Sequence, residues 1–135
     1  MLESFVQEET FRWSDVDAMG VVNNAVFLTL FEQARYGYFS SLGVMSAESF
    51  PFVLGSTSAR FESPGRSGMR VQISARVLRL GNKSLDMVYT VHCEGTQLAT
   101  GTATLVWVDA RLASITIPDA VRTAIAAREG IPARG

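Results

Sequence analysis

The chain has 135 residues, of which 47% are hydrophobic and 19% charged, and its formal net charge is −1. This length fits one domain, and the composition is that of an ordinary globular protein, so disorder is not expected. A near-neutral charge without a long basic run argues against nucleic-acid binding, which needs a positive surface. The single cysteine, Cys93, excludes a disulfide within the chain and suits a reducing compartment.

The N-terminus lacks the basic and then apolar order of a secretory signal, and no apolar run approaches the ~20 residues of a membrane helix. We therefore expect a cytoplasmic protein that does not enter a membrane. One histidine and one cysteine are too few soft ligands for a typical zinc site, so no metal is expected.

The first half of the chain predicts a strand, a turn and a helix. Residues 4–13 contain strand formers, and an acidic turn follows from Ser14 to about Val22. Asn23 or Asn24 is a good N-cap for a helix that continues to about Leu42, where Gly43 fits the left-handed C′ position. Apolar residues occupy most of the helix circumference, so we expect the helix to be largely buried.

The second half predicts four strands and a terminal helix. The pattern in 69–77 alternates apolar and polar residues, as in a sheet with one wet face, and slips after Val77, which indicates a bulge. Gly81-Asn82 suggests a type II′ hairpin turn. Loops are expected at 44–50 and 62–65, and the remaining expected elements are strands at 52–61, 85–93 and 97–108, a helix at 118–128 that begins near Pro118, and a frayed tail at 129–135.

This order predicts an α+β fold in a single domain, residues 1–135 with a core of about 6–128. Only one helix is apolar enough to be the core, and an antiparallel sheet wrapped on it is the economical architecture. The small residues Ala99, Gly101 and Ala103 on one face of a strand would let the helix approach closely.

Few residues offer chemistry. No G-x-S-x-G, Walker A or G-x-G-x-x-G motif occurs. His92 shares the polar strand face, and Cys93 shares the apolar one, where a buried inert thiol is expected. Glu32 and Arg35 are three apart in the expected helix and favour an ion pair, although Glu32 could instead hold water near a site.

The acidic turn is the remaining candidate, and it has two interpretations. Asp15 and Asp17 are residues that commonly make local hydrogen bonds in turns. Alternatively, one of these carboxylates faces a cleft beside the helix N-terminus, where backbone N–H groups polarise a carbonyl. The carboxylate would then attack the carbonyl or activate a water.

The stretch 12–28, which contains D-x-D-x-x-G and then Asn-Asn, resembles the signature of hotdog-fold acyl-CoA thioesterases of the 4-hydroxybenzoyl-CoA thioesterase-like family. Residues 31–35 are similar to the aromatic-E-x-A-R helix of that family. Residues 60–64 resemble its aromatic-x-x-P turn, and 80–84 resemble its loop of glycine, a basic residue and serine. The resemblance spans about residues 6–128.

The resemblance implies a hotdog fold, with a curved five-stranded antiparallel sheet around one long central helix and a short C-terminal helix. It also implies homodimers or homotetramers with active sites between subunits, and no metal or bound cofactor, since the CoA thioester is the substrate. Asp17 matches the catalytic nucleophile or general base, and the backbone N–H of Asn24 matches the group that polarises the thioester carbonyl. Gly20 and Asn23 are the other fixed positions of that motif.

Other residues are expected to bind substrate. The loop with Arg79, Lys83 and Ser84 matches a region that contacts coenzyme A in the family. The polar centre of the strand at 52–61 is expected to line the acyl pocket across the dimer through Ser56 and Ser58, with Glu32 near the site. Val21 stands where many relatives have histidine, which argues against a histidine-assisted mechanism.

These features predict a cytoplasmic acyl-CoA thioesterase that releases a carboxylic acid and free coenzyme A. The alternatives are the same reaction on acyl-carrier-protein thioesters, or a non-catalytic module that binds acyl-CoA. A hotdog dehydratase would need a histidine in the site, and His92 is badly placed for that role.

Overall fold

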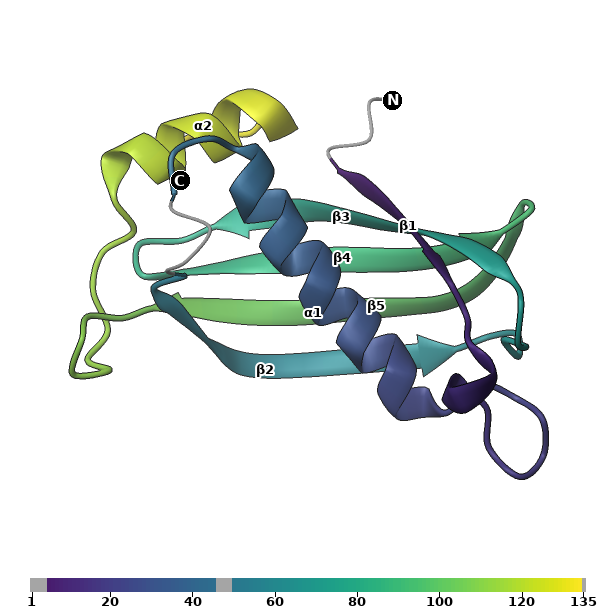
Figure 1. The fold of residues 1–135 in the computed structure, drawn as a ribbon. Coiled ribbons are helices and arrows are strands. Elements are labelled where there is room, and N and C mark those ends of the chain that lie inside the picture. The colour runs from purple at the N-terminus through teal and green to yellow at the C-terminus, as the bar shows by residue number, and fades with distance from the viewer. Residues whose placement is uncertain (1–4, 46–49, 135) are drawn as a thin grey trace.

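The computed structural model describes residues 5–45 and 50–134, and the described part folds around one five-stranded sheet (Figure 1). A single 3₁₀ turn, Trp13–Asp15, precedes the long helix. The expected loop at 44–50 lies partly outside the described residues, at 46–49. In chain order the main elements are β1 (Val6–Thr10), α1 (Asn24–Ser41), β2 (Phe52–Phe61), β3 (Arg70–Leu80), β4 (Ser84–Cys93), β5 (Thr96–Trp107) and α2 (Asp119–Glu129).

The sheet is antiparallel throughout, with the strand order β1-β3-β4-β5-β2. Helix α1 crosses one face diagonally, and α2 lies beside the end of β3 (Figure 1). The predicted architecture of one central helix wrapped by a five-stranded sheet is confirmed. No helix of the described residues combines the length and apolarity needed to cross a membrane.

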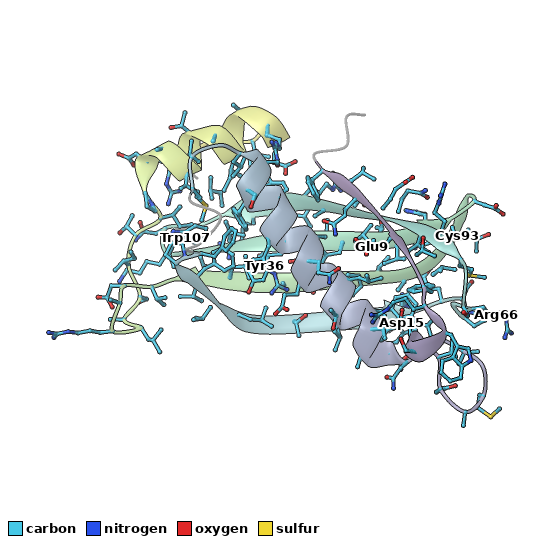
Figure 2. The ribbon with its side chains drawn as sticks, viewed as in Figure 1. Glu9, Asp15, Tyr36, Arg66, Cys93 and Trp107 are labelled. Atoms are coloured by element: carbon cyan, nitrogen blue, oxygen red, sulfur yellow. The ribbon has the colours of Figure 1, made fainter. Side chains whose placement is uncertain are left out.

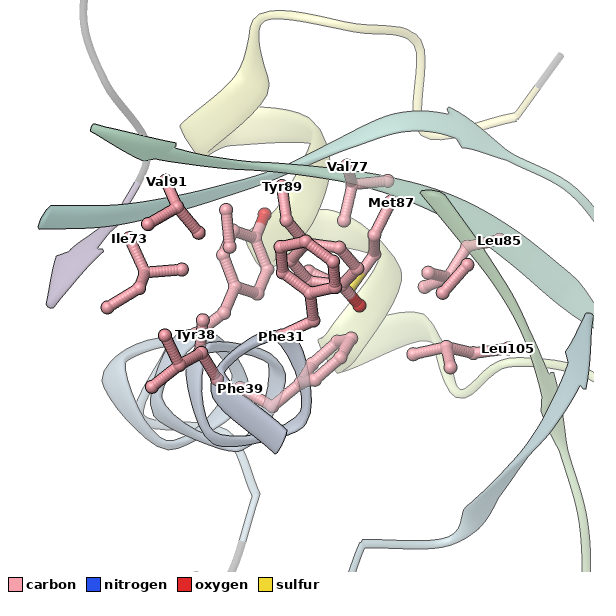
Figure 3. Packing of buried hydrophobic residues seen from close by; sticks show 14 of the residues in the cluster. Phe31, Tyr38, Phe39, Ile73, Val77, Leu85, Met87, Tyr89, Val91 and Leu105 are labelled. Carbon is pink, nitrogen blue, oxygen red and sulfur yellow. The ribbon is translucent and has the colours of Figure 1, made fainter. Parts of the chain in front are cut away.

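Helix α1 begins and ends where its capping residues predict. The Asn23 side chain accepts a hydrogen bond from the Ala25 N–H at 3.0 Å, and Gly43 has a φ of +76° just after the helix. One side packs on the sheet through Phe31, Tyr38 and other residues that are almost completely buried (Figure 3). The opposite side is less buried than expected, and Leu28 stays 44% exposed.

Gly101 on β5 fixes how closely α1 approaches the sheet. A Cβ at this position would lie only 2.5 Å from Cε2 of Phe31, so the ring occupies the space a side chain would need. Phe31 also stacks on Tyr89 of β4, with ring centroids 5.2 Å apart (Figure 3). The expected close approach over the small residues of β5 is confirmed.

The hairpin between β3 and β4 differs in part from its prediction. The register shifts between Val77 and Arg79, which confirms the bulge. The II′ turn is wrong, because Gly81 does not have the positive φ that this turn needs. Glycine is required there for space: a Cβ would lie 2.5 Å from an Arg79 guanidinium nitrogen and 2.9 Å from the Ser84 carbonyl oxygen.

The C-terminal segment is held rather than frayed. Helix α2 extends through Glu129, with Pro118 as its N-cap and Gly130 in the left-handed conformation at its end. Arg122 is 2% exposed, and its guanidinium donates to carbonyl oxygens of Ala133, at 2.9 Å, and of the β3–β4 hairpin. The expected tail therefore packs back on the domain, because a buried cation ties it to the hairpin.

Candidate active site

The acidic turn forms a closed loop between β1 and α1. An isolated bridge joins Val16 to Val22, and the Asp17 N–H donates to the Val21 carbonyl oxygen at 2.8 Å. The Asn23 N–H donates to the Asp15 carbonyl oxygen at 2.9 Å, which anchors the loop to the start of α1. The loop therefore carries its side chains from a fixed base at the N-terminal end of the helix.

The two aspartates of the turn have different environments. Asp15 is 7% exposed and accepts hydrogen bonds from the Arg12 backbone N–H at 2.7 Å and from its guanidinium at 2.9 Å. The hydrogen bond from the Arg12 side chain lowers the pKa of Asp15 below its ordinary value. This carboxylate holds the loop together and is not available for chemistry.

Asp17 is exposed, and only one of its carboxylate oxygens is engaged. Oδ1 accepts from the Met19 N–H at 2.8 Å and from the Val21 N–H at 3.3 Å, the local hydrogen bonds of a turn. Oδ2 accepts no hydrogen bond from any residue that the structure describes. The carboxylate is therefore oriented by the loop and retains a free oxygen.

The first turn of α1 offers a free hydrogen-bond donor. The Asn24 N–H makes no hydrogen bond within residues 5–45 and 50–134, whereas Asn23 caps the helix with its side chain. A cavity of about 250 Å³ adjoins Asn24, and Val21, Phe27, Phe61 and six other residues line it, from the loop, the helix start and the segment 61–65. A carbonyl group that entered this cavity would meet the positive end of the helix.

Gly20 shapes the loop between these groups. Its φ is +77°, a backbone conformation that favours glycine, and its carbonyl oxygen faces the Arg66 guanidinium at 3.5 Å. Val21 is half-buried and forms an apolar part of the cavity wall. Asp17 is not itself a lining residue of this cavity; the carboxylate that lines it is Glu62, which accepts a hydrogen bond from the Gln97 side chain at 2.9 Å.

The central residues of β2 alternate between the two sheet faces. Thr57 is paired with the buried Ala103 and lines a second cavity, of about 210 Å³, between α1 and β2. Ser56 and Ser58 are paired with Thr104 and Thr102 and therefore point to the face away from α1. In the protomer, Thr57 rather than either serine faces the cavity.

Glu32 is exposed and lines the same second cavity. The expected ion pair with Arg35 is wrong: the two groups do not come within salt-bridge distance. Arg35 turns inward instead, and its Nε donates to the Tyr89 hydroxyl at 2.9 Å. The spacing along the helix favoured an ion pair on its surface, but Arg35 instead bonds to Tyr89, which is 54 residues away in the sequence.

The basic residues of the β3–β4 hairpin are only partly free. Arg79 pairs with Asp86 at 2.6 Å and donates to the Ser84 hydroxyl at 3.2 Å. The Lys83 ammonium is exposed and has no partner within the described part of the chain. Lys83 is thus the cation of this hairpin that remains available for a phosphate.

The structure does not bring this hairpin to Asp17 within one protomer. Strand β3 has 11 residues and starts near the acidic loop, so its far end is about 35 Å away at 3.3 Å per residue. Figure 2 shows Asp15 at one end of the sheet and Trp107 at the other, and the Trp107 N–H donates to the Lys83 carbonyl oxygen.

Two other reactive side chains are uninvolved. Cys93 is half-buried at the end of β4, so it is more accessible than expected. His92 contacts the Thr90 hydroxyl at 3.4 Å on the polar face of the sheet, which agrees with a structural role. Among the described residues no group of three or more His, Cys, Asp or Glu is placed to hold a metal ion.

The chain is similar in sequence and in fold to known proteins. The profile of the Thioesterase-like superfamily matches residues 11–125. A thioesterase from Thermus thermophilus, crystallised with coenzyme A and zinc, is 33% identical with a TM-score of 0.89, over 96% of this chain and 97% of that chain. A protein from Pseudomonas aeruginosa is 28% identical with a TM-score of 0.82, over 93% of this chain and 91% of that chain.

A 1,4-dihydroxy-2-naphthoyl-CoA thioesterase from Synechocystis has the same fold, at 21% identity and a TM-score of 0.80, over 90% of this chain and 94% of that chain. No curated protein matches the chain significantly. The superfamily profile includes the acidic loop, α1 and all strands from β2 to β5. The chain therefore belongs to the Thioesterase-like superfamily and has the hotdog fold of its solved relatives.

Proposed function

We propose that the protein hydrolyses acyl-CoA thioesters to a carboxylic acid and free coenzyme A. One observation carries the proposal: Asn24, whose N–H is unbonded, lines a cavity of about 250 Å³, and the free oxygen of Asp17 belongs to the hydrogen-bonded loop that leads into the same helix start. The thioesterase from Thermus thermophilus, with its bound coenzyme A, supports coenzyme A as the thiol.

In this reaction the thioester carbonyl oxygen accepts a hydrogen bond from the Asn24 N–H, which stabilises negative charge as the tetrahedral intermediate forms. Asp17 either takes a proton from the attacking water or attacks the carbonyl carbon itself, forming an anhydride that water then opens. The carbon–sulfur bond breaks, and the thiolate of coenzyme A leaves and takes up a proton. These steps need no metal or bound cofactor.

The complete site is proposed to form between two subunits. Strand β2 is a sheet edge of ten residues whose side chains are mostly exposed, a shape that favours pairing with another strand. Antiparallel pairing of two β2 strands would place the Phe52 end of one protomer beside the Phe61 end of its partner. Phe52 is opposite Trp107, at the Lys83 end, and Phe61 lines the cavity at Asn24.

This dimer would overcome the separation of about 35 Å within one protomer. Lys83 from one subunit would then bind the phosphates of coenzyme A while Asp17 of the other attacks the thioester. Two such dimers could associate further into a tetramer. A single cysteine and the use of coenzyme A both fit a cytoplasmic protein.

The test is a thiol-release assay on aromatic, short-chain and long-chain acyl-CoAs, with a carrier-protein thioester as a further substrate. Asp17→Asn is expected to lower kcat by a factor of about 100 or more, because it removes the nucleophile or base. The thermal midpoint should stay near that of the parent, since Asp17 is exposed. A variant that turns over acyl-CoA at the parent rate would overturn the role of Asp17.

A further inference from the structure

The second cavity, between α1 and β2, contains a buried cation. It measures about 210 Å³ and is lined by Leu28, Thr29, Phe31, Glu32, Arg35, Leu54 and Thr57. Its position follows directly along the α1–β2 seam from the cavity at Asn24, since Phe27 of the first cavity and Phe31 of the second are one helical turn apart. The two cavities therefore lie about one helical turn apart along α1.

Arg35 is the polar feature of this second cavity. It is 6% exposed, its Nε donates to the Tyr89 hydroxyl at 2.9 Å, and its guanidinium lies 5.6 Å from the centre of the Tyr89 ring. The two terminal nitrogens donate to no residue in the described ranges 5–45 and 50–134, and no carboxylate there comes within salt-bridge distance. Arg35 itself lines the cavity.

Neither neighbour supplies the missing acceptor. Burial raises the pKa of Tyr89, so at neutral pH its hydroxyl is uncharged and does not balance the guanidinium. Glu32 lines the same cavity but is exposed to solvent and does not contact Arg35. Solvent still reaches the terminal nitrogens, which are not among the fully buried unpaired polar atoms of the described residues, so an acceptor brought by a ligand would replace water there.

We propose that Arg35 is a specificity-determining residue that binds the distal end of the acyl group, so that the preferred substrates carry an oxygen acceptor there, a carboxylate or a hydroxyl. This inference rests on the proposed function, because it assigns the α1–β2 seam to the acyl group. A carboxylate matches the planar guanidinium with two hydrogen bonds. A hydroxyl accepts from Arg35 and can also donate to Glu32 in the same cavity.

The Cα positions of Asn24 and Arg35 are eleven residues, or about 16 Å, apart along the helix, and the long Arg35 side chain leans back toward the N-terminus. The acyl group must span less than this distance between its thioester carbon and its distal oxygen. A purely aliphatic group of the same length would fill the seam and leave the guanidinium without an acceptor. Discrimination should therefore depend on the tip of the acyl group as well as on its length.

Calorimetry with non-hydrolysable thioether analogues of acyl-CoA tests this inference independently of turnover. Each chain length is prepared with a carboxylate, a hydroxyl or a methyl tip. At the best length, the parent protein should bind one polar tip at least tenfold more tightly than the methyl tip. Arg35→Met should abolish this preference, whereas Arg70→Met, on the exposed face away from α1, should preserve it.

Two further variants keep the test decisive if Arg35→Met fails to fold. Tyr89→Phe removes the hydroxyl that orients Arg35 and should reduce the preference while retaining the ring stack. Glu32→Gln distinguishes the two polar tips: it should strengthen binding of a carboxylate by removing a like charge, and weaken binding of a hydroxyl by replacing a charged acceptor with a weaker neutral one.

The inference is wrong if the parent protein binds the methyl tip as tightly as both polar tips at every length, or binds none of the analogues. Thiol release by the parent protein from matched thioesters is measured in parallel. Hydrolysis without a preference for polar tips would overturn the inference alone. A preference without hydrolysis would overturn the proposed reaction and leave Arg35 as a recognition residue.

Discussion

At its N-terminal end α1 meets solvent and a cavity, whereas at its C-terminal end it is tied to α2. The Asn24 N–H and one oxygen of Asp17 have no partners among the described residues. At the other end the Tyr38 hydroxyl donates to Glu129 at 2.6 Å, and Glu129 also accepts from the Val77 N–H at 2.8 Å. The comparison indicates that the C-terminal end holds the helix on the sheet, while the N-terminal end keeps polar groups available for a ligand.

The largest expected effect comes from removing the free donor at the N-terminal end. Asn24→Pro deletes the N–H, while proline is well tolerated at the first helical position and Asn23 already has the extended conformation that precedes proline. We expect kcat to fall by a factor of about 100 to 1,000, the cost of losing one oxyanion donor. Thiol release measures this loss, and calorimetric melting should show little change.

Asn24→Ala is the matched control, because it keeps the backbone N–H and removes only an exposed side chain. Its activity should remain near that of the parent. If the alanine variant lost as much activity as the proline variant, the side chain rather than the N–H would be responsible, and the assignment of the oxyanion donor would be wrong.

A smaller effect, on stability, is expected at the C-terminal end. Glu129→Ala leaves the Tyr38 hydroxyl and the Val77 N–H without their acceptor and should lower the free energy of unfolding by about 1–3 kcal/mol. Urea titration measures this change. Glu94→Gln, at an exposed turn, is the control. A Glu129→Ala variant with a lower kcat and an unchanged free energy of unfolding would contradict the structural role assigned to the C-terminal end of the helix.

The smallest effect concerns Asp15, which lies beside the proposed site without belonging to it. Because the hydrogen bond from Arg12 lowers the pKa of Asp15 in the folded protein, its contribution to stability is complete above the ordinary pKa of 3.8. The contribution is lost as the pH falls through the lower folded pKa. Asp15→Asn should cost about 1 kcal/mol at pH 7 and make stability less dependent on pH below about 5.

Chemical denaturation of the parent and the Asp15→Asn variant between pH 3 and pH 7 measures this difference. Activity of the folded variant should remain near that of the parent, in contrast to Asp17→Asn. If the free energy of unfolding of the variant falls with decreasing pH as steeply as that of the parent, Asp15 does not contribute to stability as its hydrogen bonds indicate.

The parts of the fold that depend on local pattern were predictable from the sequence. Helix α1 was placed within about a residue at each end, because Asn23 and Gly43 supply caps that act locally. The inner strands followed their period of two. The exposure of β2 was not predictable in this way, since its edge position depends on the order in which distant strands pair.

The chemistry of the site was less accessible to sequence reasoning. Asp15 and Asp17 are the same residue type two positions apart, and only the folded position of Arg12 separates a structural carboxylate from an available one. The environment of Arg35 was mispredicted because helical spacing points to Glu32, whereas the contact with Tyr89 exists only after the sheet forms. Side-chain partners that are distant in the chain are set by packing, which a local pattern does not contain.

The contact between Phe31 and Gly101 also determines where the proposed chemistry takes place. Asn24 lies seven residues before Phe31, about 10 Å along a rigid helix. Since the ring sits over a residue without a side chain, any larger residue at 101 would displace the helix and, with it, the Asn24 amide. A mutant library aimed at new substrates should therefore leave Gly101 unchanged and vary the residues around the α1–β2 seam, where the acyl group can be altered while the oxyanion donor stays in place.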